Sequence, residues 1–103
     1  MLNRMAKLSE VIEAHEHGRG SAQSFLFQGH TYEWLGVTKG TKSKPAVSTY
    51  GGDTSIIKFY FNERRELLRV SLCELLERTI FTIYEKEWSY EEKRDAWYDF
   101  GCY

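Results

Sequence analysis

The sequence predicts a single α+β domain over residues 1–103, in which a small antiparallel sheet of about two hairpins packs with an N-terminal helix and two C-terminal helices. Apolar residues repeat with helical spacing near both ends of the chain and alternate in the middle, and these two patterns indicate helices and strands. A hydrophobic content of 42%, with 16% aromatic residues, is enough for a folded core and too high for a disordered chain.

The first element is expected to be a helix near the N-terminus. Met5, Leu8 and Ile12 recur at spacings of three and four residues, which places them on one face of a helix. Gly18 and Gly20 follow, and glycine is the commonest residue just beyond a helix end. We therefore expect the helix to stop before Gly18.

A hairpin is expected next. Phe25 and Phe27 fall on one face of an alternating segment, and Tyr32 and Trp34 alternate in the same way a few residues later. Gly29 lies between the two segments and allows the positive φ angle that tight hairpin turns require.

Residues 38–53 are expected to form a long loop, because they hold three glycines, the only proline and several hydroxyl residues. Loops of this length in compact domains are usually functional or mobile. The run from Gly36 to Ser43 falls short of a P-loop, since Thr41 stands where that motif requires a glycine before its lysine. We expect a flexible basic loop here.

Residues 54–61 are expected to form a strand, and the segment after it has two interpretations. In one, residues 62–65 turn into a short return strand over 67–70, and a helix begins after Ser71. In the other, a single long helix runs over 63–88. We prefer the first, because Ser71 and Glu74 form a capping box that marks a helix start.

A second capping box, Ser89 with Glu92, predicts that the last helix begins near Tyr90. This helix is expected to end at Phe100, because Gly101 follows in the usual stop position.

The two cysteines, Cys73 and Cys102, lie far apart and form no CxxC pair, so we expect both to be reduced thiols. No apolar run is long enough to span a bilayer, and the first residues lack the apolar stretch of a secretory signal. These observations predict a cytoplasmic protein without a membrane segment.

No catalytic or metal signature stands out. His15 and His17 lie two residues apart, so on a helix their imidazoles point to nearly opposite faces. Cys73 follows the Ser71 cap, where a helix field lowers thiol pKa values, but the same position suits a buried cysteine. We expect no enzyme activity, no cofactor and no metal.

Charge is unevenly distributed along the chain. Residues 1–73 carry ten Lys or Arg against seven Asp or Glu, whereas residues 74–103 carry four against eight. The net charge of −1 is low for a nucleic-acid-binding domain. The two parts of the chain therefore favour partners of opposite charge.

The preferred hypothesis is a small regulatory or inhibitor-type binding module that docks on another protein, or on a second copy of itself. Its acidic, aromatic C-terminal segment is rich in the residue types that dominate protein interfaces. The expected contact residues are Trp88, Asp95, Tyr98, Asp99 and Tyr103.

The alternative hypothesis is a nucleic-acid-binding domain that uses the basic loop over 38–52 and cations of the sheet. Lysines and arginines interleaved with an aromatic side chain can contact phosphates and stack against bases. The residues of this alternative are Lys39, Lys42, Lys44, Lys58, Tyr60, Arg64, Arg65 and Arg69.

Overall fold

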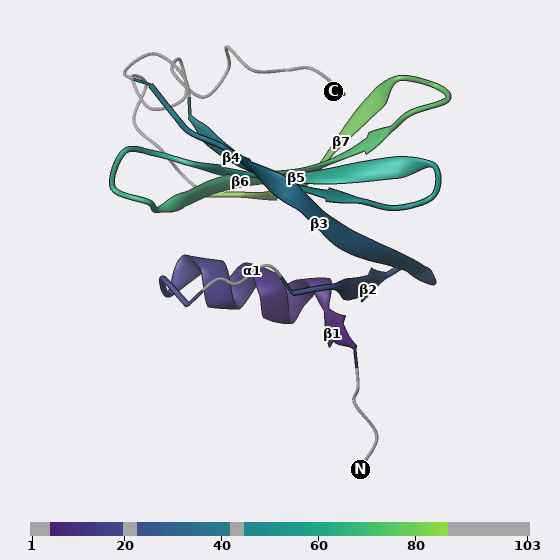
Figure 1. Ribbon diagram of the computed structural model, residues 1–103, viewed down its shortest axis with the longest axis horizontal. Helices are drawn as coiled ribbons and strands as arrows, with labels where there is room; N and C mark the ends of the chain where they lie inside the picture. Colours follow the sequence, from purple (N-terminus) through teal and green to yellow (C-terminus); the bar gives the residue numbers. More distant parts are fainter. Residues whose placement is uncertain (1–4, 20–22, 42–44, 87–103) are drawn as a thin grey trace.

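The computed structural model describes residues 5–19, 23–41 and 45–86. Within them, one helix covers one face of a curled seven-stranded sheet whose strands lie in the order of the sequence (Figure 1). β1 and β2 are parallel, and all other neighbouring strands are antiparallel. The elements are β1 (Ala6–Lys7), α1 (Leu8–Glu16), β2 (Phe25–Phe27), β3 (His30–Thr38), β4 (Ala46–Gly51), β5 (Ser55–Phe61), β6 (Leu67–Glu74) and β7 (Thr79–Glu85).

The α+β prediction, with two hairpins and three helices, is therefore wrong. Strands account for 55% and helix for 12% of the structure, so the domain is mostly β-sheet. The helix that the sequence predicts from Tyr90 to Phe100 lies outside the described residues.

The N-terminal helix is present over Leu8–Glu16, and its end is set by a glycine. Its predicted start was wrong, because Met5 lies before the helix and is exposed, and Ala6–Lys7 form β1. The amide of Gly18 donates to the carbonyl of His15, and the amide of Arg19 donates to the carbonyl of Ala14. These two hydrogen bonds form a Schellman motif, with Gly18 in the left-handed conformation at φ +68°. Leu8 and Val11 are buried against the sheet.

The first hairpin is also present where the sequence places it. Phe25 pairs with Tyr32, and Phe27 pairs with His30. Gln28 and Gly29 form the two-residue turn between the strands, and both have positive φ angles, 51° and 80°. Two positive φ angles define a type I′ turn, which matches the right-handed twist of the strands it joins.

β4 lies inside the segment 38–53 that the sequence predicted to be a loop. The loop signals flank a short run, Val47 to Tyr50, that contains β-branched and aromatic residues. β4 pairs with β3 on one side and β5 on the other, and Tyr50 is fully buried. Pairing with a strand on each side and the burial of Tyr50 outweigh the loop-forming composition of the residues around this short run.

The helix predicted after Ser71 is wrong, and so is the single helix over 63–88. β6 continues through Ser71 to Glu74, and β7 returns beside it after the turn at 75–78. Residues 79–84 are Thr, Ile, Phe, Thr, Ile and Tyr, all of which favour strands because their side chains fit a pleated surface. This local preference outweighs the helical spacing of the leucines and isoleucines.

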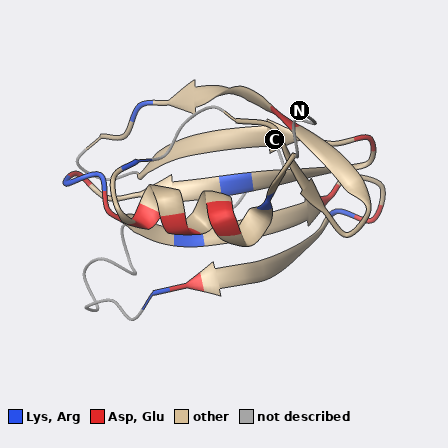
Figure 2. Ribbon diagram, turned by 90° about the horizontal axis from the view of Figure 1, so that it is seen from below, with Lys and Arg blue, Asp and Glu red and all other residues tan. Residues whose placement is uncertain are grey.

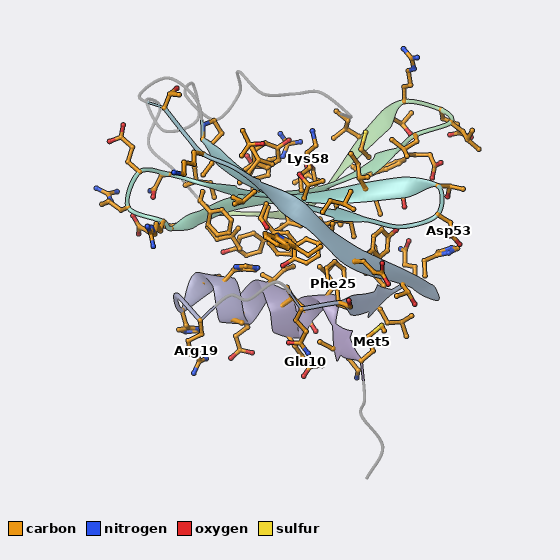
Figure 3. All side chains as sticks on the ribbon, viewed as in Figure 1. Met5, Glu10, Arg19, Phe25, Asp53 and Lys58 are labelled. Atoms are coloured by element: carbon orange, nitrogen blue, oxygen red, sulfur yellow. The ribbon has the colours of Figure 1, made fainter. Side chains whose placement is uncertain are left out.

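The core lies between α1 and the sheet and is built mainly from aromatic rings. The ring of Phe25 lies 5.5 Å from that of Tyr32, in a stacked arrangement, and 5.0 Å from that of Tyr50. Phe59 packs edge-on against Tyr50 at 5.2 Å. Strand pairing places these rings on the face that α1 covers, as Figure 3 shows for Phe25.

The sheet curls around the helix, as the view in Figure 2 shows. The pairing register shifts at three places, between Trp34 and Gly36, between Tyr60 and Phe61, and between Val70 and Ser71. Irregularities of this kind bend a strand and increase its twist. The curl brings the ends of β3 and β5 toward the C-terminal end of α1.

Candidate binding surfaces

The residues proposed for protein docking fall beyond the part of the chain that the structure describes. They are Trp88, Asp95, Tyr98, Asp99 and Tyr103. In sequence, this acidic and aromatic segment follows directly after β7, which ends at Glu85. The docking role of this segment therefore stays a prediction. The strand that precedes the segment, β7, is described by the structure.

The sheet residues of the nucleic-acid hypothesis lie together but are buried. Tyr60 on β5 pairs with Arg69 on β6, and Lys58 lies two residues before Tyr60 on the same face. This face points away from α1, as Figure 3 shows for Lys58. Lys58 exposes 4%, Tyr60 3% and Arg69 8% of its surface. Such side chains offer little area to a nucleic acid.

The remaining cations of that hypothesis lie at one end of the sheet. Arg64 and Arg65 belong to the β5–β6 turn, and Lys39 follows β3. Arg64 forms an ion pair with Glu66 across 2.8 Å. Lys42 and Lys44 lie outside the described residues.

The β6–β7 hairpin exposes four apolar side chains at the edge of the sheet. Leu76 exposes 82% and Phe81 55% of its surface, and Leu75 and Ile80 are also exposed. We call these four residues the hairpin patch. Ile80 and Phe81 are consecutive in β7, so their side chains point to opposite faces of the sheet, and the four residues share the hairpin rather than one face.

β7 is also the last strand of the sheet within the described residues. It is seven residues long and contains neither glycine nor proline, and charged residues stand only at its ends (Arg78, Glu85 and Lys86). Strand edges are commonly protected from pairing by short length, proline or charge in the strand. β7 carries few of these protections along its length.

A cleft of about 860 Å³ lies at the other end of the domain. Its walls come from the end of α1, from the residues that follow β3, and from the β5–β6 turn. Val37, Ala46 and Phe61 contribute apolar surface, and Lys39 and Arg65 contribute positive charge. The structure thus brings together two cations that lie far apart in the sequence.

His15 lines this cleft and is half-buried. Its ring centroid lies 4.8 Å from that of Phe59 and 5.3 Å from that of Phe61. The hydroxyl of Tyr50 lies 3.5 Å from His15 Nε2, at the outer limit of a hydrogen bond. Burial lowers the pKa of His15 below its ordinary value of 6.5, so the imidazole is mostly neutral near pH 7.

Sequence reasoning missed His15 as part of a site. The spacing of His15 in the sequence could have shown that it faces the sheet. It lies four residues after Val11 and seven after Leu8, and these two residues mark the buried side of the helix. His17, by contrast, is exposed, and its Nδ1 lies 2.9 Å from the carbonyl oxygen of Glu13.

Two general findings hold for residues 5–19, 23–41 and 45–86. No three side chains of His, Cys, Asp or Glu gather closely enough there to hold a metal ion. No helix in the same residues is long and apolar enough to cross a membrane.

Cys73 corrects the expectation of reduced thiols. It is 2% exposed, packs with Ile56, and is disulfide-bonded. Cys102, the other cysteine of the chain, lies outside the described residues. A buried, oxidised Cys73 is not available as a nucleophile.

Comparisons with known proteins found no matching family, no similar curated protein and no similar solved structure.

Proposed function

We propose that the protein is a non-catalytic module that docks on another protein through the hairpin patch and the acidic, aromatic segment after β7. The observation that supports this proposal is the exposure of Leu76 and Phe81, 82% and 55%, on the hairpin at the sheet edge. Covering such side chains with a partner releases water from apolar surface and so favours association.

The partner segment that fits this surface is an extended chain with alternating apolar residues and nearby basic residues. An edge strand offers backbone donors and acceptors to an added strand, and pockets for alternate side chains give specificity. From residue 74 onward, eight acidic residues outnumber four basic ones. That excess favours a basic partner and speeds its approach.

Photo-crosslinking tests the proposal in the protein's own cells. Phe81 is replaced by p-benzoylphenylalanine in the full chain, and covalent adducts are identified by mass spectrometry after irradiation. Leu35 on β3, which is 66% exposed, receives the same replacement as a control. We expect an adduct with one protein at position 81 and none at position 35.

Equal crosslinking at positions 81 and 35, or no crosslinking at position 81, would show that the hairpin patch is not the docking surface. An adduct between two copies would instead make the surface a homodimer contact. The double variant Tyr98→Ala, Tyr103→Ala tests the C-terminal segment separately. If crosslinking at position 81 is unchanged in this variant, Tyr98 and Tyr103 do not belong to the contact.

Nucleic-acid binding is the second candidate, and it is supported by Lys39 and Arg65 on the wall of one cleft. It requires phosphate contacts, so binding of labelled DNA or RNA must weaken steeply as salt increases. Fluorescence anisotropy across a salt series tests it. Lys42→Glu with Lys44→Glu is expected to weaken binding to all sequences alike, because phosphate contacts carry no base information. Absence of binding at low salt would reject this candidate.

For the compartment, our proposal is the cytoplasm. The disulfide at Cys73 argues against it, so the redox state of Cys73 in cells is the test. Disulfides are rare where glutathione and thioredoxin keep thiols reduced. Cells are lysed in excess alkylating agent, and the modification of Cys73 is read by peptide mapping. Alkylated Cys73 supports the cytoplasm, whereas Cys73 that reacts only after reduction indicates an oxidising compartment.

A further inference from the structure

We propose that the cleft between the end of α1 and the β5–β6 turn binds a small organic anion with an aromatic body. The cleft volume of about 860 Å³ lies within the range of roughly 300–1,000 Å³ that ligand pockets occupy. No residue of the hairpin patch lines the cleft, so this site does not depend on the proposed docking function.

The apolar lining suits a flat ring. Val37 and Ala46 contribute aliphatic surface from two neighbouring strands, and the ring of Phe61 lines the cleft beside the imidazole of His15. Val37 is 57% exposed, so a ligand that covers it removes apolar surface from water. Aromatic rings gain further by packing edge-on or offset against other rings.

The charges of the lining call for a single negative charge on the ligand. Lys39 and Arg65 line the cleft together with the one carboxylate of Glu63. None of these three side chains has an ion-pair partner within the described residues. His15 is mostly neutral near pH 7, since burial lowers its pKa. The described lining therefore carries one net positive charge, which a monoanion balances.

Arg65 also provides a well-controlled variant. Its φ angle of 62° lies in the left-handed region, where glycine is the easiest residue to accommodate. Arg65→Gly thus removes a cation from the cleft without introducing backbone strain. Arg78 has a similar φ angle, 55°, in the β6–β7 turn and does not line the cleft, so Arg78→Gly is the matched control.

The experiment is an NMR titration of the ¹⁵N-labelled full chain with 2-naphthoate. Two further probes separate the contribution of the negative charge from that of the aromatic ring. The neutral 2-naphthylmethanol keeps the ring without the charge, and acetate keeps the charge without the ring. We expect saturable shifts at the amides of His15, Val37 and Phe61, and weaker binding of both other probes. Arg65→Gly should raise the Kd for 2-naphthoate about fivefold, whereas Arg78→Gly should leave it unchanged.

Three results would overturn the proposal. One is the absence of saturable shifts at the cleft with millimolar 2-naphthoate. Another is an equal increase in the Kd for 2-naphthoate in Arg65→Gly and Arg78→Gly, which would show that only the net charge of the protein attracts the anion. The third is a set of shifts centred on Leu76 and Phe81, which would place the probe on the hairpin patch. None of these results bears on crosslinking at position 81, so the two proposals fail separately.

Discussion

The hydroxyl of Tyr84 on β7 donates a hydrogen bond to Oε2 of Glu16 at the end of α1, across 2.6 Å. This contact joins the edge strand to the only helix in the described part of the chain. Burial, and then the hydrogen bond and charge of Glu16, raise the pKa of Tyr84 to about 12. β7 is therefore held by its pairing with β6 and also by a link to the helix.

Removing this hydroxyl should weaken the fold. Tyr84→Phe is expected to lower the free energy of unfolding by about 1 kcal/mol, the usual net value of one hydrogen bond. Because the folded pKa is raised above 10, the contribution is fully present below pH 10 and is lost as the pH rises through about 12. Urea unfolding at pH 8 measures the difference. An unchanged midpoint would show that the bond adds no stability.

The β5–β6 turn is organised around Glu66. Its Oε1 accepts hydrogen bonds from Asn62 Nδ2 at 3.1 Å and from Arg64 Nε at 2.8 Å, and Lys86 Nζ lies 3.4 Å from Oε2. The hydrogen bonds from Asn62, Arg64 and Lys86, in that order, lower the pKa of Glu66 to about 2. Asn62 Oδ1 accepts in turn from the amides of Arg64 and Glu66.

Glu66→Gln is therefore expected to lower the free energy of unfolding near neutral pH and to leave it unchanged near pH 2. A lowered folded pKa stabilises the protein above the ordinary value of 4.5, and this contribution disappears as the pH falls toward 2. Wild-type and variant unfolding curves should differ at pH 6 and converge near pH 2. A ¹³C NMR titration of the Glu66 carboxyl gives the pKa directly, and a midpoint near 4.5 would contradict the prediction. Glu63→Gln, in the same turn, is the control.

The sequence predicted elements correctly where local signals agree with tertiary contacts. The N-terminal helix, the first hairpin and the strand over 55–61 are present, as is the turn at 62–65 that leads into a return strand. The failures share one cause. Ser71 and Glu74 mimic a helix start, and the glycines near β4 mimic a loop, while pairing with both neighbouring strands decides the outcome.

The candidate cleft could be predicted only in part. Lys39 and Arg65 were recognised as cations, but their meeting depends on β4, which brings the end of β3 near the β5–β6 turn. Lys58 and Arg69 were expected on an exposed sheet face and are buried. Alternation shows which side chains share a face of a sheet, but it does not show whether that face is open to solvent.

The turn between β2 and β3 offers a stabilising substitution. Gln28 has φ 51° at the first position of a type I′ turn, where asparagine is favoured because it tolerates the left-handed conformation. Gln28→Asn is expected to raise the free energy of unfolding by about 0.5–1 kcal/mol. Thermal unfolding measures this change. Gln28→Val, a β-branched residue poorly suited to positive φ, should have the opposite effect, and equal stability of the two variants would contradict the turn assignment.

His15 should make stability depend on pH in the neutral to mildly acidic range. Its ring packs against Phe59 and Phe61 near the Tyr50 hydroxyl, no carboxylate within the described residues is hydrogen-bonded to it, and burial lowers its pKa. A lowered histidine pKa stabilises the fold above pH 6.5, and the contribution is lost as the pH falls below that value. His15→Leu should therefore flatten the fall in stability between pH 7 and 5, whereas His17→Leu should preserve it.

The same residue reports on the cleft. An anion held beside an imidazole favours its protonated form, so bound 2-naphthoate should raise the pKa of His15. A ¹H–¹⁵N NMR titration of the ring, with and without 2-naphthoate, measures this shift. In Arg65→Gly the shift should require more ligand, because the cleft has lost one of its two cations. A His15 pKa that is insensitive to saturating ligand would mean that the anion does not lie next to His15, even if its ring occupies the cleft.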